Sequence, residues 1–116
     1  MKMTPKNIAK LMLEKKASEI KIFDVKKITS LTDYFIICTS ESEPQTKAIT
    51  NHIERTMKKN GVKPIHIEGL NKNEWILMDY VTIIVHIFSK EKRGFYDLNR
   101  LWADAKITDI KEKHEN

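Results

Sequence analysis

An uninterrupted apolar strand followed by a well-marked helix constrains the fold of this chain most. Residues 34–38 are all apolar, which is typical of a central strand covered on both faces of a sheet. A helix start follows, because Ser42 stands three residues before Gln45 with a proline between them, the pattern of a capping box. Gly61 supplies the stop, and a further strand is predicted at 65–67. Strand, helix and strand in this order predict a parallel, right-handed crossover.

The remaining periodic segments complete one domain. Apolar residues at helical spacing predict a helix over 5–17, and alternation at period two predicts a strand over 20–25. Strands at 74–79 and 82–88 are joined by a link too short for anything but a hairpin. The fold class is therefore α/β: residues 1–104 form a single domain with a mixed sheet of about five strands and flanking helices. Residues 105–116 are expected to be a charged tail that frays.

Composition indicates a protein of the cytoplasm. The single cysteine, Cys38, lies in an apolar run and makes no internal disulfide, which fits a reducing compartment and a buried structural thiol. No apolar stretch approaches the roughly 20 residues that a membrane span requires. The first residues are not followed by the apolar core of a signal peptide.

The net charge of +5 is concentrated at the start of the chain. Residues 1–32 hold 8 Lys and 3 acidic residues, whereas the rest of the chain balances to zero. A basic segment of this kind indicates a nearby polyanion, although any single lysine is more often solvated surface. The candidates for such a contact are Lys15, Lys16, Lys26 and Lys27.

The sequence lacks the usual patterns of catalytic and cofactor sites. Its 3 glycines form no Gly-x-Gly array, so no phosphate-loop fingerprint is available. No two of its histidines have the spacing of a helical zinc site, and paired carboxylates of a metal-dependent transferase are absent. His86 alternates with Ile84 and Phe88, which predicts a histidine hydrogen-bonded in or near the core. We therefore expect no enzymatic activity, no cofactor and no metal.

Aromatic residues gather instead between residues 75 and 102. Two apolar strands lead there into a short segment that contains Phe95, Tyr96 and Trp102. Large aromatics among scattered charges are typical of a protein-binding face, because they bury area and still satisfy their polar tips. The alternative is that these rings only close a small core.

The order and spacing of three motifs resemble the Iojap-like ribosomal silencing factors (RsfS). The resemblance runs from about residue 32 to residue 102, and it departs from the family at four residues in three places. Ser40 stands where the family usually has Gly, Val81-Thr82 replaces a common Gly-Asp, and Asn99 replaces a frequent Glu. The motifs are Asp33-Tyr34-Phe35-Ile36-Ile37-Cys38 with Ser42, Gln45 and Ala48; Glu68-Gly69, Trp75-Ile76-Leu77-Met78-Asp79-Tyr80 and Val85-His86-Ile87-Phe88; and Arg93, Phe95, Tyr96, Leu98, Leu101 and Trp102.

The resemblance implies a small non-enzymatic factor with a nucleotidyltransferase-like fold that lacks the catalytic acids. Family members bind the large ribosomal subunit through its protein fourteen, block small-subunit joining and repress translation under nutrient limitation. Organelle relatives act in large-subunit assembly, and free members form homodimers. The resemblance implies no membrane and no small-molecule substrate.

On this interpretation an aromatic cluster binds the ribosomal protein, two acids pair with its basic groups, and the four lysines lie toward ribosomal RNA. The alternatives are an assembly factor, a general adaptor, and a nucleotide-binding protein that uses Thr39, Ser40 and Asp79. The residues predicted to bind the ribosomal protein are Trp75, Asp79, Tyr80, Glu91, Tyr96, Leu98 and Trp102.

Overall fold

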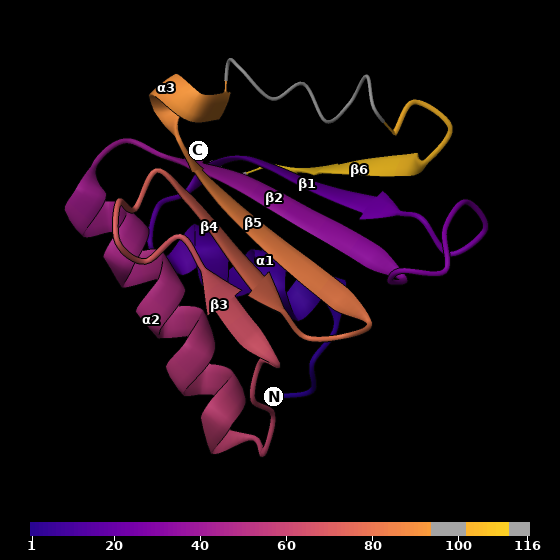
Figure 1. Ribbon diagram of the computed structural model, residues 1–116, viewed down its shortest axis with the longest axis horizontal. Coiled ribbons are helices and arrows are strands. Elements are labelled where there is room, and N and C mark those ends of the chain that lie inside the picture. Colours follow the sequence, from indigo (N-terminus) through magenta and orange to yellow (C-terminus); the bar gives the residue numbers. More distant parts are fainter. Residues whose placement is uncertain (94–101, 112–116) are drawn as a thin grey trace, which may run out of the picture.

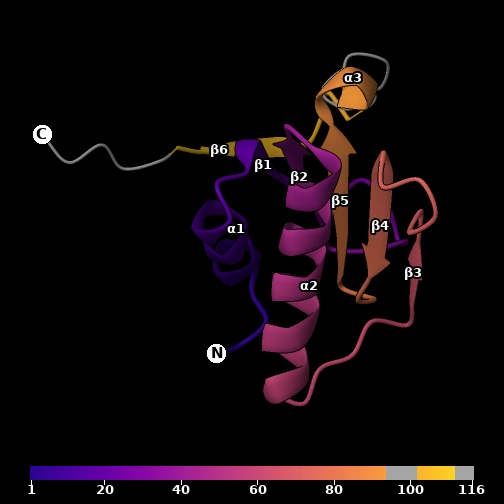
Figure 2. The same cartoon turned by 90° about the vertical axis from the view of Figure 1, so that its left-hand side faces the viewer.

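A mixed six-stranded sheet carries two helices on one of its faces (Figures 1 and 2). The computed structural model describes residues 1–93 and 102–111. Helices α1 and α2 lie side by side against the same face of the sheet, and the short α3 follows the end of β5. The elements are α1 (Pro5–Glu14), β1 (Ser18–Asp24), β2 (Tyr34–Ser40), α2 (Glu43–Lys59), β3 (His66–Glu68), β4 (Trp75–Asp79), β5 (Ile83–Ser89), α3 (Lys90–Arg93) and β6 (Lys106–Ile110).

Helix α2 begins and ends where its sequence signals predict. The hydroxyl of Ser42 accepts a hydrogen bond from the backbone N–H of Gln45 at 3.2 Å, which is one half of the capping box. The side chain of Gln45 does not complete the box but accepts from the backbone N–H of Glu41. At the other end Gly61 has φ +80°, and the N–H of Val62 donates to the carbonyl of Met57 at 2.9 Å, a Schellman motif.

Strand order differs from the simplest prediction. The sheet runs β3-β4-β5-β2-β1-β6, with β2 and β5 parallel and every other neighbouring pair antiparallel. Strand β3 therefore runs parallel to β2, as the predicted crossover requires, but the β4–β5 hairpin lies between them. The predicted hairpin is confirmed.

The sheet has a sixth strand where a frayed tail was expected. Residues Lys106–Ile110 form β6 and pair antiparallel with β1, so the expectation of a frayed tail from residue 105 is wrong for these residues. An ion pair of 3.1 Å between Lys21 and Asp109 joins the two strands. As an edge strand, β6 needs backbone pairing on only one side. Its charged side chains break the alternation of apolar and polar residues by which a strand is predicted from sequence.

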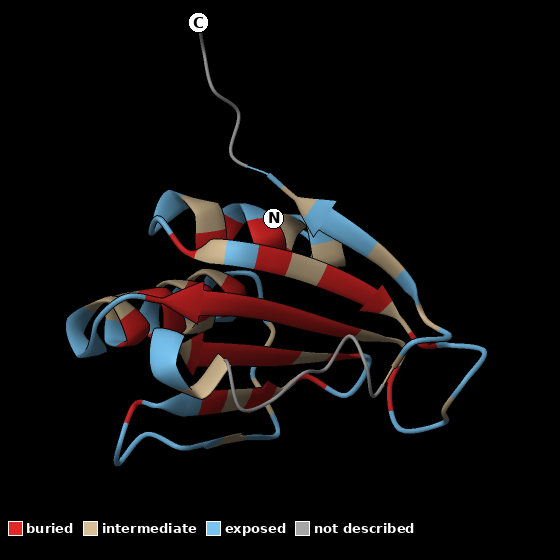
Figure 3. Ribbon diagram, turned by 90° about the horizontal axis from the view of Figure 1, so that it is seen from above, coloured by how far each residue is buried: buried red, intermediate tan, exposed pale blue. Residues whose placement is uncertain are grey.

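The pleat divides the strands into two apolar layers. The layer that faces α1 and α2 is the larger core and includes Ile36, Val85 and Ile87, together with Ile49 and Ile53 of α2. The opposite layer contains Phe23, Phe35, Ile37 and Phe88 and is packed against Ile84, Trp102, Ala105 and Ile107. Figure 3 shows that buried residues dominate the central strands and exposed ones the outer elements.

Candidate protein-binding face

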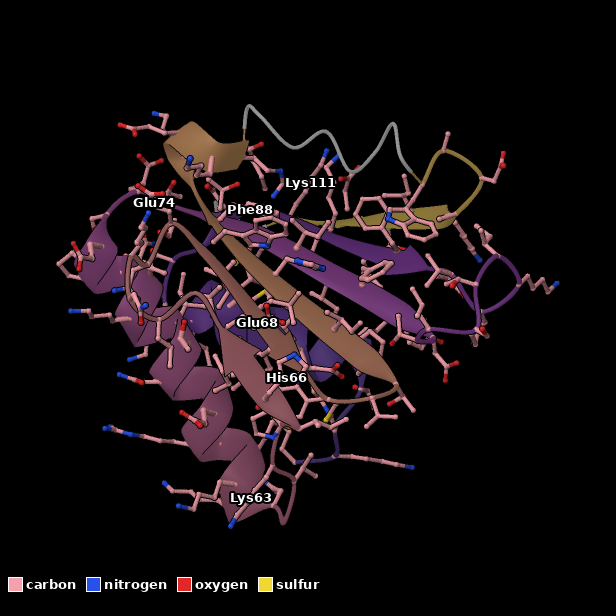
Figure 4. The ribbon with its side chains drawn as sticks, in the orientation of Figure 1. Lys63, His66, Glu68, Glu74, Phe88 and Lys111 are labelled. Atoms are coloured by element: carbon pink, nitrogen blue, oxygen red, sulfur yellow. The ribbon has the colours of Figure 1, made fainter. Side chains whose placement is uncertain are left out.

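The face of the sheet that points away from α1 and α2, here called the open face, gathers the aromatic residues of the hairpin. In β4 and β5 the register pairs Trp75 with Phe88, Leu77 with His86 and Asp79 with Ile84. Cross-strand partners share a face, so these six side chains form a continuous layer, in which Phe88 and His86 are buried. Strand β2 extends this surface inward with Phe35 and Ile37, and β3 extends it to the edge with His66 and Glu68. Figure 4 shows Phe88 on β5 and the two β3 residues at the edge of the sheet.

Among the residues that the structure describes, Trp75 is the exposed aromatic residue of this face. Its side chain is 36% exposed, whereas the neighbouring Phe88 is fully buried. The indole stacks on the ring of Phe88, with centroids 5.2 Å apart and planes inclined by 23°. Its Nε1–H donates a hydrogen bond to Nδ1 of His86 at 3.0 Å. The indole is therefore partly exposed to solvent, while its polar atom is satisfied by a neighbour on the same face.

Next to Trp75, across the sheet, the rings continue as a buried layer. The ring of His86 stacks on Phe88 with a centroid separation of 5.9 Å and lies 5.5 Å from the ring of Phe35. Phe35 in turn contacts the half-buried Trp102 at 5.1 Å. A rigid aromatic layer of this kind supports the exposed ring beside it, because packed side chains have few alternative rotamers.

Burial keeps His86 uncharged. The side chain is 6% exposed, and removal from water lowers its pKa to about 4. The predicted role of His86, a hydrogen-bonded histidine in or near the core, is confirmed. Sequence reasoning did not link His86 to Trp75; the register that places Leu77 opposite His86 and Phe88 opposite Trp75 brings the two rings together.

Acidic groups lie toward the outer edge of the open face. Asp79 is half-buried, and its Oδ1 accepts the backbone N–H of Val81 at 2.8 Å. Glu68 is exposed on β3 and pairs with His66, with Nε2 and Oε2 2.8 Å apart. Asp79 thus helps to hold the hairpin turn as well as contributing charge to the face.

A hollow of about 340 Å³ opens beside Trp75. Its walls come from the loop between β3 and β4 and from α3, which are linked by an ion pair of 3.7 Å between Lys92 and Glu74. Gly69 lies in this loop with φ +91°, where a Cβ would overlap the backbone oxygen of Trp75. The glycine therefore allows the loop to lie against the start of β4.

The predicted partner-binding residues have different fates. Trp75, Asp79 and Trp102 lie on the open face or its margin, and Glu91 is exposed on α3. The prediction for Tyr80 is corrected, because the residue is 5% exposed and packs into the core on the helix side. Its ring cannot be a surface anchor. Its burial raises the pKa of the hydroxyl to about 12. Tyr96 and Leu98 lie outside the described residues.

The four predicted RNA-facing lysines form two separate pairs. Lys15 and Lys16 are exposed just before β1, and Lys26 and Lys27 are exposed just after it. The seven residues of β1 separate the pairs by about 20 Å at roughly 3.3 Å per residue. Lys26 also donates to the hydroxyl of Tyr34 at 2.8 Å, which raises the pKa of Lys26. One phosphate group cannot contact both pairs.

The described part of the chain contains no cluster of three His, Cys, Asp or Glu side chains arranged to hold a metal ion. Among its helices none is long and apolar enough to cross a membrane.

Comparison with known proteins identifies the family. The model of the family described as RsfS, ribosomal silencing factor during starvation, matches residues 2–116. The chain belongs to this family. The ribosomal silencing factor of Bacillus subtilis is 35% identical over 97 residues, which cover 84% of this chain and 82% of the relative. The factor of Haemophilus influenzae is 39% identical over 76% of this chain and 86% of its own length. The chloroplastic Iojap protein of Zea mays is 31% identical over 85% of this chain and 43% of its own length.

Solved structures agree with this assignment. A crystal structure of a Chromobacterium violaceum protein superimposes with a TM-score of 0.76 at 33% identity, covering 87% of this chain and 88% of that one. A Bacillus halodurans protein gives a TM-score of 0.79 at 28% identity, covering 90% of this chain and 95% of that one. The resemblance expected from the three sequence motifs is therefore confirmed, and the RsfS family is one of regulatory proteins rather than enzymes.

Proposed function

We propose that this RsfS-family chain binds the large ribosomal subunit through its protein fourteen and sterically blocks joining of the small subunit. It thereby represses translation in the cytoplasm when nutrients are limiting. Family membership supports the ribosomal partner. The observation that carries the choice of surface is the exposed indole of Trp75 beside a buried aromatic layer. In the free state the chain is proposed to form a homodimer.

The open face has the composition of a protein interface. Trp is among the residues most often found as energetic anchors, and such anchors lie in well-packed surroundings. The hollow beside Trp75 offers space for a side chain of the partner. Asp79 and Glu68 place carboxylates toward the outer edge of the open face, and Glu91 is exposed on α3; these three suit basic side chains of a partner.

Binding at this face would act by exclusion. A folded chain of this size, seated on the surface where the small subunit docks, occupies volume that the two subunits otherwise close. Catalysis is not required, because binding to one state of an equilibrium shifts that equilibrium in proportion to affinity. Lys15, Lys16, Lys26 and Lys27 are proposed to add a salt-dependent attraction to ribosomal RNA.

A subunit-joining assay tests this function. Separated subunits are mixed with magnesium at increasing concentrations of this protein, and the amount of joined ribosomes is measured by light scattering. We expect fewer joined ribosomes when the chain is added to large subunits first. A Trp75→Ala variant should need a much higher concentration to reduce joining by the same amount. Leu31→Ala, which removes an exposed apolar side chain from the loop between β1 and β2, is the matched control.

Three results would redirect the proposal. Binding to large subunits without an effect on joining would favour a role in subunit assembly. Binding to neither subunit would leave the open face to another protein partner. A rise in the melting temperature on addition of nucleotide and magnesium would favour the nucleotide-binding alternative, because a bound ligand stabilises the folded state.

A further inference from the structure

The indole of Trp75 is held in place by neighbouring rings on the same face of the sheet. It is stacked on Phe88 at 5.2 Å and lies 5.9 Å from the ring of His86. Stacking fixes the plane of an aromatic ring more tightly than the position of the ring within that plane, because several offset arrangements have similar energy. The hydrogen bond from Nε1–H of Trp75 to Nδ1 of His86, at 3.0 Å, adds a directional contact within that plane.

This hydrogen bond requires one protonation state of His86. The indole N–H only donates, so Nδ1 must offer a lone pair and the imidazole must be neutral, with its proton on Nε2. Protonation at Nδ1 would replace the acceptor with a donor and break the contact. The imidazole ring is itself fixed by stacking on Phe88 and by the nearby ring of Phe35.

The surroundings of His86 keep it in this state. Its neighbours across the sheet are Leu77 on β4 and Ile37 on β2, both apolar. The charged side chains in the same row are Glu68 on β3 and Lys21 on β1, each two strands away, or about 10 Å at roughly 4.8 Å per strand. From α3, Arg93 points to the hydroxyl of Thr39 at 3.2 Å. Burial among these groups lowers the pKa of His86 to about 4.

We propose that His86 is a positioning residue for partner binding: its Nδ1 fixes the exposed indole of Trp75 in the binding orientation before the partner arrives. This inference rests on the proposed function of the open face. A side chain that is already ordered loses less conformational entropy on binding, which is worth roughly 2- to 10-fold in affinity for one large side chain. His86 would thus raise affinity without touching the partner.

A double-mutant cycle separates this role from simple packing. His86→Phe keeps a flat ring but removes the acceptor, and Trp75→Phe keeps a stacked ring but removes the donor. Affinity for purified large ribosomal subunits is measured for the wild type, both single variants and the double variant. We expect His86→Phe to weaken binding roughly 2- to 10-fold alone and to have little further effect in the Trp75→Phe background, because the hydrogen bond is already gone there. His86→Asn, whose amide oxygen is bonded to Cγ as Nδ1 is and can accept from the indole, should restore most of the affinity.

The free protein supplies a readout that needs no ribosome. In the wild type the indole N–H resonance of Trp75 should exchange slowly with solvent, and His86→Phe should accelerate that exchange. Equal weakening by His86→Phe in both backgrounds would overturn the inference, since only packing would then be involved. If His86→Phe speeds exchange of the Trp75 indole N–H but leaves the affinity for large subunits unchanged, the inference about His86 is also overturned. In that case binding by the wild type would still support the proposed function. Failure of the wild type to bind large subunits would overturn the proposed function, and this inference with it.

Discussion

Lowering the pH should destabilise the folded chain through one buried imidazole, that of His86. In the unfolded chain a histidine titrates near 6.5, whereas burial lowers the pKa of His86 in the folded chain to about 4. Between these two values the unfolded state binds more protons than the folded state. The free energy of unfolding therefore falls as the pH falls through this window. From above pH 6.5 down to about pH 5 the loss is about 2 kcal/mol, rising to about 3 kcal/mol below pH 4.

Urea denaturation at several pH values between about 8 and 4.5 measures this loss, with circular dichroism as the probe. His86→Gln is the reference, because it has no titrating group at this position while all other histidines and carboxylates are shared. We expect the wild type to lose about 2 kcal/mol more than this variant on going from neutral pH to about pH 5, a large part of the stability of a small domain. Parallel pH profiles for the two proteins would refute the reasoning, because they would mean that His86 titrates alike in both states.

Three further predictions concern the turns and the lysines. Val81 has φ +74°, and across it the Thr82 N–H donates a hydrogen bond to the Tyr80 carbonyl, as in a strained γ-turn. Because glycine adopts this conformation without strain, Val81→Gly should raise the free energy of unfolding by about 1 kcal/mol. Thermal denaturation beside Thr82→Gly checks this, and a lower melting temperature for Val81→Gly would contradict it. Gly69→Ala should lower the free energy of unfolding by well over the roughly 1 kcal/mol expected of Gly61→Ala. Both glycines have positive φ, but only at Gly69 would the new Cβ overlap a backbone atom. Equal urea midpoints for the two variants would argue against that close approach. Replacing Lys15 and Lys16, or Lys26 and Lys27, by Gln should flatten the dependence of log affinity on log salt by about 0.9 for each phosphate group that is no longer neutralised. Salt titration of subunit binding measures these slopes, and identical slopes in both double variants and the wild type would exclude the RNA contact.

The fold was predictable where local signals were strong. The Ser42 cap, the Gly61 stop and the β4–β5 hairpin each depend on a few neighbouring residues, and all three are confirmed. The first helix ends at Glu14 rather than Ala17, because Lys16 adopts φ +63° and the N–H of Ala17 turns back to Met12. A non-glycine residue in this conformation gives no sequence signal.

Long-range features were harder to foresee. The position of the hairpin between β2 and β3 depends on which edges pair, and periodicity carries no information on strand order. The open face was found only in part: Trp75 and Asp79 stood out by type, but Tyr80 follows them at the end of the strand and turns to the core. His86 and Phe88 were recognisable as sharing a face, and only the register shows that they support Trp75.

Co-sedimentation with separated ribosomal subunits tests the central claim most directly. Wild type, Trp75→Ala and Leu31→Ala are each centrifuged with large and with small subunits, after circular dichroism has shown that all three are folded. We expect the wild type and Leu31→Ala to pellet with large subunits but not with small subunits. We expect Trp75→Ala to bind roughly 30-fold more weakly, if about 2 kcal/mol of binding free energy comes from the anchor. Undiminished pelleting of a folded Trp75→Ala variant would contradict the assignment of the open face as the ribosome-binding surface.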